Sequence, residues 1–161
     1  MANKFRDNAG YAVVETNDVA AVRTGRMKAQ YPTKDGVDLE NGMLVVVNEK
    51  EKQIELPGAE YSGKFALHAS EERLYESHLG RNAFILKGET QIPRVLLLED
   101  GDVFETSAIA TETIEDYGVP AANGLIDLVA DVTGQDMYLE VVEEVTLPNG
   151  KPGIKFAVKF A

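Results

Sequence analysis

The residues from Gly58 to Lys64 have the spacing of a phosphate-binding loop. They read Gly-Ala-Glu-Tyr-Ser-Gly-Lys, which matches the GxxxxGK pattern whose backbone N–H groups and lysine hold nucleotide phosphates. Phe65 stands where a serine or threonine hydroxyl should reach magnesium, and Pro57 precedes the loop directly. The pattern therefore favours a glycine-rich surface turn, and a small nucleotide-binding protein that uses the Gly58–Lys64 loop is kept as an alternative.

The two histidines of the chain lie among acidic residues. His68 and His78 flank Glu71, Glu72 and Glu76, and imidazole and carboxylate groups together are common metal ligands. Their ten-residue separation is not a metal-ligand motif. We therefore interpret this group as a solvated helix face and predict no metal site.

Other residue types also fail to form a catalytic pattern. Glu99, Asp100 and Asp102 surround Gly101, but the alternating acids and the final glutamate of a calcium loop are missing, so a turn is predicted. The chain has no cysteine and no serine in a GxSxG elbow. We expect neither enzyme activity nor a cofactor.

One basic cluster stands out, formed by Arg23, Arg26 and Lys28. These residues suit a docking site for an acidic partner surface, because electrostatic complementarity orients association. A solvated loop is the equally weighted alternative.

Charge is unevenly distributed over the 161 residues, which together carry a net charge of −11. Residues 1–36 carry +2, residues 37–150 carry −16, and residues 151–161 carry +3. Such an acidic body argues against nucleic-acid binding, which needs a basic surface. No apolar run approaches a membrane span and no signal peptide is apparent, so we expect a cytoplasmic product that binds neither membrane nor nucleic acid.

Short strands are predicted throughout the chain. Runs rich in β-branched and aromatic residues are separated by Gly, Pro, Asn and Asp, as is typical of an antiparallel β-barrel or sandwich. The expected strands lie at residues 11–16, 19–22, 43–47, 53–56, 83–86, 95–99, 103–109, 137–147 and 154–160.

The clearest hairpin is predicted at Asn149-Gly150. If these two residues form the whole loop, Glu144 faces Lys155 and Glu140 faces Lys159, and opposite charges across paired strands are favourable. Glu143 would then point inward, a conflict that a bulge or a longer loop would remove.

A second hairpin is predicted at Asp100-Gly101, joining residues 95–98, expected to be central and buried, to residues 103–104. Helix is scarce: one short helix is expected from Ser70 to His78, and one turn near residues 114–117. We predict an extended N-terminal arm with the first strands in residues 1–36, and a β-rich body in residues 37–161.

Two stretches carry a resemblance to a known class of protein. Residues 11–32 (YAVVETNDVAAVRTGRMKAQYP) and 67–109 (LHASEERLYESHLGRNAFILKGETQIPRVLLLEDGDVFETSAI) resemble small proteins encoded beside the major capsid protein of tailed bacteriophages. The resemblance implies an auxiliary head protein, of the cement or decoration kind. It fixes no functional residue.

The expected function is therefore structural. The resemblance implies a virion protein that binds the lattice of the major capsid protein in many copies beside one another and stabilises the head. Another virion component, such as a head fibre base or a tail protein, is the alternative, and the nucleotide-binding protein is the second alternative.

Overall fold

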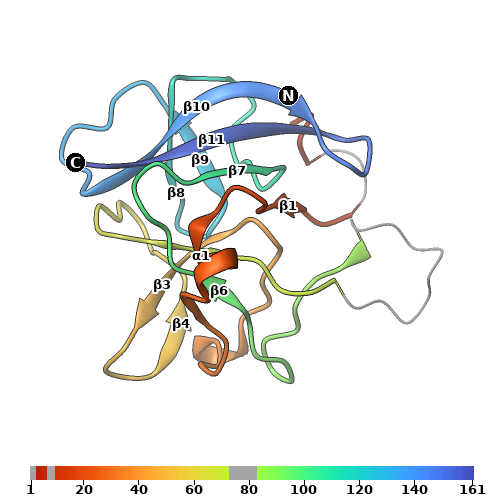
Figure 1. Cartoon of the computed structure of the whole chain (residues 1–161), viewed down its shortest axis with the longest axis vertical. Helices are drawn as coiled ribbons and strands as arrows, with labels where there is room; N and C mark the ends of the chain where they lie inside the picture. The colour runs from red at the N-terminus through yellow and green to blue at the C-terminus, as the bar shows by residue number, and fades with distance from the viewer. Residues whose placement is uncertain (1–2, 7–9, 73–82) are drawn as a thin grey trace.

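The computed structural model describes residues 3–6, 10–72 and 83–161, and in these ranges the chain is mainly β (Figure 1). Its strands form two antiparallel sheets, and neither strand order closes on itself. The described ranges add one short α-helix, α1 (Ala20–Thr24), and one 3-10 turn, η1 (Lys34–Gly36). The predicted fold class, mainly β and antiparallel with one short helix, is confirmed.

The six-stranded sheet combines the first strand of the chain with every strand after residue 100. Its order is β1-β7-β11-β10-β8-β9. The strands are β1 (Val14–Glu15), β7 (Val103–Thr106), β8 (Tyr117–Pro120), β9 (Ile126–Val129), β10 (Met137–Thr146) and β11 (Pro152–Phe160).

The five-stranded sheet is built from the part of the chain between these elements. Its order is β2-β6-β5-β3-β4. The strands are β2 (Met27–Lys28), β3 (Leu44–Asn48), β4 (Gln53–Glu55), β5 (Ala66–His68) and β6 (Val95–Leu96).

The main core lies between the two sheets. Phe104 and Phe156 of the six-stranded sheet share one buried cluster with Leu67 and Leu96 of the five-stranded sheet. The neighbours of these leucines along the strands, such as Val95, lie in a second buried cluster on the other face of the five-stranded sheet. The five-stranded sheet is therefore buried on both faces, as its near-continuous apolar strands require.

The strand predicted at residues 19–22 is wrong, because this segment forms the helix α1, which begins at Ala20. Ala20 and Ala21 are good helix formers, and Gly25 ends the helix in the left-handed conformation at φ 72°. The Asp102 side chain accepts a hydrogen bond from the Ala20 N–H at 3.0 Å. This acceptor comes from a distant part of the sequence, so local strand propensity is a poor guide here.

The β10–β11 hairpin is present, with a longer loop than the predicted two residues. The Leu147 N–H donates to the Lys151 carbonyl at 2.8 Å, which leaves residues 148–150 as the loop, with Gly150 at φ 81°. Three-residue hairpin loops need such a left-handed residue. The pairing shifts once more at a bulge between Val141 and Glu143.

These shifts change which charges face each other. Glu143, not Glu144, lies opposite Lys155 and contacts it at 3.9 Å, so the predicted Glu144–Lys155 pair is wrong. Lys159 lies opposite Tyr138 and reaches Glu140 at 3.7 Å. Both lysines thus pair with glutamates inside the sheet, although not in the predicted register.

The prediction that residues 95–98 pair with residues 103–104 through a hairpin at Asp100-Gly101 is also wrong. A turn is present, closed by the Asp102 N–H and the Glu99 carbonyl at 3.1 Å. The strands on its two sides, β6 and β7, belong to different sheets, so the chain crosses here from one sheet to the other. β6 itself is central and buried, as predicted for residues 95–98.

Two other predicted elements differ, and a third lies mostly outside the described residues. Residues 114–116 form no helical turn, and strand β8 begins at Tyr117. Residues 83–86 contribute one bridge, between Leu86 and Leu39, in place of a strand. Most of the helix predicted from Ser70 to His78 falls in residues 73–82, outside the described residues.

The N-terminal segment packs on the rest of its own chain. Phe5 is buried in the main core, and the Arg6 guanidinium makes two hydrogen bonds to the Glu40 carboxylate, at 2.7 and 2.8 Å. β1 and β2 lie in different sheets. The first strands of the chain therefore contribute to both sheets.

Candidate functional site

The Gly58–Lys64 segment is a surface turn between two strands. It follows β4 and leads into β5, whereas a phosphate-binding loop leads into a helix whose N-terminus faces the phosphates. The Lys64 ammonium lies 5.1 Å from the ring centroid of Phe160, and the Tyr61 hydroxyl donates to the Lys64 carbonyl. Both contacts hold the turn against its own chain.

His68 is fully buried on β5, so its predicted place on a solvated helix face is wrong. Its Nδ1 lies 2.8 Å from the Glu40 carbonyl and its Nε2 lies 2.8 Å from the Ser70 hydroxyl. A carbonyl only accepts, so Nδ1 carries the proton, and Nε2 accepts the Ser70 O–H. Burial, with a smaller contribution from the charge of Arg94, lowers the pKa of His68 to about 4, although the hydrogen bond to the Glu40 carbonyl acts in the opposite direction.

Ser70 and His68 have the contact that a nucleophile and its base would have, and Ser70 borders a pocket of about 280 Å³. A catalytic base must take up a proton during the reaction, and here burial and the nearby Arg94 both oppose the charged imidazole. The Ser70 hydroxyl also accepts the Arg94 N–H at 3.0 Å. We interpret the pair as a structural link between β5, β6 and the loop at Glu40.

The acids around Gly101 form the predicted turn. Asp102 is buried, and besides Ala20 it accepts the Glu99 N–H at 2.7 Å. Asp100 accepts the Phe160 N–H at 2.8 Å. Among the residues that the structure describes, no group of three or more histidines and acids could hold a metal ion.

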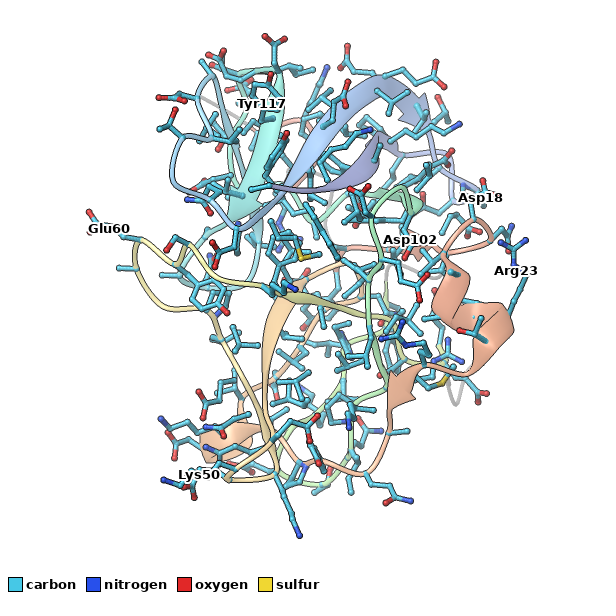
Figure 2. All side chains as sticks on the ribbon, turned by 60° about the vertical axis from the view of Figure 1, so that its left-hand side comes forward. Asp18, Arg23, Lys50, Glu60, Asp102 and Tyr117 are labelled. Carbon is cyan, nitrogen blue, oxygen red and sulfur yellow. The ribbon has the colours of Figure 1, made fainter. Side chains whose placement is uncertain are left out.

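The predicted docking residues Arg23, Arg26 and Lys28 do not form one free basic patch. Arg26 pairs with Glu99, and Lys28 pairs with Glu49 at 2.8 Å. The hydrogen bond to Glu49 raises the pKa of Lys28. Arg23 points outward from α1 (Figure 2), and no ion pair is found for it within the described ranges.

The fold exposes a different surface, which is the outward face of the six-stranded sheet. Along β7, β8 and β9, from Ile154 to Lys159 of β11 and from Met137 to Glu140 of β10, buried residues alternate with residues that are partly or fully exposed. The buried set packs into the core, so the other set faces away from it. In the described part of the chain, no strand or helix packs over this second set, which we call the outer face.

Apolar side chains occupy the middle of the outer face. The strand register aligns Val103, Ala157, Glu140, Tyr117 and Val129 in one row across five strands. Tyr117 also contacts Tyr138 edge to face, with ring centroids 5.6 Å apart. The six apolar side chains of the outer face are Val103, Tyr117, Val119, Val129, Tyr138 and Ala157.

Charged side chains lie beside these apolar ones, and one of them, Glu140, lies in the middle of the row. Five carboxylates and two lysines belong to the outer face, and each lysine is paired with one of the carboxylates. The charged residues are Glu15, Glu105, Asp127, Glu140, Glu143, Lys155 and Lys159. Three carboxylates are left in excess, so the outer face has a negative charge.

A hollow lies on the β1–β7 side of the outer face. It has a volume of about 260 Å³, and its lining includes Glu15, Asp18, Val103, Glu105 and Pro148. Three of these five are acidic and none is basic. The hollow thus combines apolar and acidic side chains, as the outer face does.

No residue of the outer face was predicted as a site residue. The Asn123-Gly124 dipeptide, which turns the chain between β8 and β9, is the signal that would have placed Tyr117 and Val119 on a strand. The pairing of β7 with β11 and of β10 with β8 was not readable, because these strands are neighbours in the sheet but are not consecutive in the sequence.

Comparison with protein-family models, with curated proteins and with solved structures finds no match to this chain. Of the helices in the described ranges, none has the length and apolar character needed to cross a bilayer.

Proposed function

We propose that this chain is a structural protein of a phage virion, which binds the lattice of the major capsid protein as an auxiliary, cement or decoration protein. The observation that carries the proposal is the outer face, a broad six-stranded surface on which apolar side chains lie beside charged ones, with Glu140 among the apolar residues of the central row. Protein interfaces combine apolar and polar side chains in one patch. It suits a protein whose task is to bind a large, flat partner.

The fold brings together the two stretches that resemble phage head proteins. Within the first stretch lie β1 and β2, and within the second lie β6, β7 and all of β5 except its first residue. β1 pairs with β7, and β2 pairs with β6. The resemblance therefore covers one connected unit that joins both sheets, while β8 to β11, which supply most of the outer face, lie outside it.

The test is binding of the purified full chain to shells of the phage assembled without it. We expect binding that saturates at a fixed number of copies per shell, because a lattice offers a fixed number of equivalent positions. Cosedimentation with the shells measures it. Failure of the protein to sediment with the shells at any concentration would remove the proposal.

A further inference from the structure

We infer that the outer face docks on a basic surface of a different protein, in preference to a second copy of this chain. The inference rests on the proposed function, because it names the chemistry of the surface that the capsid lattice would present. It is carried by the distribution of charge over the fold, the pairing of the two lysines and the shape of the outer face.

Charge is divided sharply along the sequence. Residues 95–150 contain thirteen aspartates and glutamates and no lysine, arginine or histidine. β7, β8, β9 and β10 lie wholly inside this segment, and all four belong to the six-stranded sheet. Every basic side chain of the outer face therefore comes from β11. Figure 2 shows many carboxylates at the end of the molecule where Tyr117 lies, opposite the end with Lys50.

The two lysines of β11 do not cancel the negative charge that the outer face presents to a partner. Lys155 contacts Glu143 at 3.9 Å, and Lys159 contacts Glu140 at 3.7 Å, so each lysine is already engaged within the sheet. A second copy would bring the same negative face, on a chain of net charge −11. Like charges placed opposite each other oppose association, so face-to-face pairing of two copies is disfavoured.

The shape of the outer face suits arginine or lysine side chains. The hollow lined by Glu15, Asp18, Val103 and Glu105 offers an apolar wall for the methylene groups of such a side chain and carboxylates for its charged end. Tyr117 and Tyr138 stand as aromatic contacts at the other side of the face, and arginine and aromatic residues are enriched in interfaces. The partner is therefore expected to present basic side chains with apolar ones between them.

The test uses charge reversal in the shell-binding assay. Glu140→Lys changes the centre of the outer face, where the Glu140 side chain is 51% exposed. Glu51→Lys makes the same change in net charge at an exposed turn beside Lys50, at the opposite end of the molecule. Glu143→Lys serves as a second outer-face variant. Thermal unfolding of all three checks that each variant folds like the wild type.

We expect Glu140→Lys and Glu143→Lys each to weaken shell binding by about tenfold or more, and Glu51→Lys to change it less than about twofold. Wild-type binding should also weaken as salt rises, since salt screens exposed charges. Equal binding by all variants would overturn the inference and leave the proposed function standing. Absence of wild-type binding would instead remove the proposed function.

Sedimentation velocity of the isolated protein tests whether a second copy of this chain binds the outer face instead. We expect no dimer that depends on the outer face. A wild-type dimer that Glu140→Lys abolishes and Glu51→Lys preserves would show that a second copy occupies the outer face, and would overturn the inference.

Discussion

At the scale of single residues, His68 makes the stability of the fold depend on pH. Its pKa is about 4 in the folded chain and about 6.5 when unfolded. Between these values the unfolded chain holds a proton that the folded chain does not, so acid favours unfolding. We expect the free energy of unfolding to fall by up to about 3 kcal/mol as pH falls from 6.5 to 4. Urea unfolding at a series of pH values measures it.

His68→Gln removes this titration and provides the comparison. The variant should be less stable at pH 7, because the link to Glu40 and Ser70 is disturbed, but its stability should fall less steeply below pH 6.5 than that of the wild type. His78→Gln controls for the second histidine. Equal slopes for the wild type and His68→Gln would contradict the assignment.

Two ion pairs of the N-terminal segment differ in burial and should differ in strength. The Arg6 pair with Glu40 is mostly buried, with the Glu40 side chain 8% exposed, and Glu40 also accepts the Ala12 N–H at 2.8 Å. The Lys4 pair with Glu144 is about half exposed on both sides. Arg6→Ala should destabilise the fold by about 3 kcal/mol, because it leaves a buried carboxylate without its partner, and Lys4→Ala by less than about 1 kcal/mol.

Denaturant unfolding of the two variants checks this difference. The outcome that contradicts it is an equal loss of stability from Arg6→Ala and Lys4→Ala, since burial would then have no influence on the two pairs.

At the scale of elements, one side chain ties α1 to the turn between the sheets. Asp102 accepts the Ala20 N–H with one oxygen and the Glu99 N–H with the other. Asp102→Ala should lower the free energy of unfolding by about 1–2 kcal/mol, as the loss of a helix cap does. Asp100→Ala, two residues away, is a control for the turn. Chemical denaturation gives both values, and no difference from the wild type for Asp102→Ala would refute the cap.

The hairpin of β10 and β11 shows how far sequence reasoning reaches. The position of the turn and the pairing of both lysines with glutamates followed from Asn149-Gly150 and the charge pattern. The register did not, because the loop has three residues and the bulge after Val141 shifts the pairing. The Leu147–Lys151 hydrogen bond that closes the loop cannot be predicted from the local composition of the sequence.

Elements that depend on distant contacts were the ones predicted wrongly. α1 forms where a strand was predicted, and the Asp102 side chain accepts the N–H of its first residue, Ala20. β8 was not predicted, and it contains Gly118 and Pro120, which are uncommon inside strands. Gly118 fits there because a Cβ at that position would lie 2.8 Å from the Ile126 side chain. The close packing of β8 on β9 is visible only in the fold.

At the scale of the whole molecule, the sequence predicted the mainly β fold, but the docking surface that it suggested is not the outer face proposed from the structure. The sequence drew attention to Arg23, Arg26 and Lys28 because they form a basic cluster. The fold engages two of them in ion pairs, and it brings acidic and apolar side chains of several strands together on the outer face. The acidic character was readable from the sequence, whereas its combination with Tyr117, Tyr138 and Val103 on one face needs the sheet order.

The central claim is that this chain covers a capsid lattice, and its copy number in purified virions tests that claim most directly. Quantitative gel densitometry against the major capsid protein gives the number. The proposed function predicts a fixed lattice-compatible ratio, such as one copy per capsid subunit. A handful of copies per virion would point to a fibre base or tail protein, and complete absence from virions would contradict a structural role in the particle.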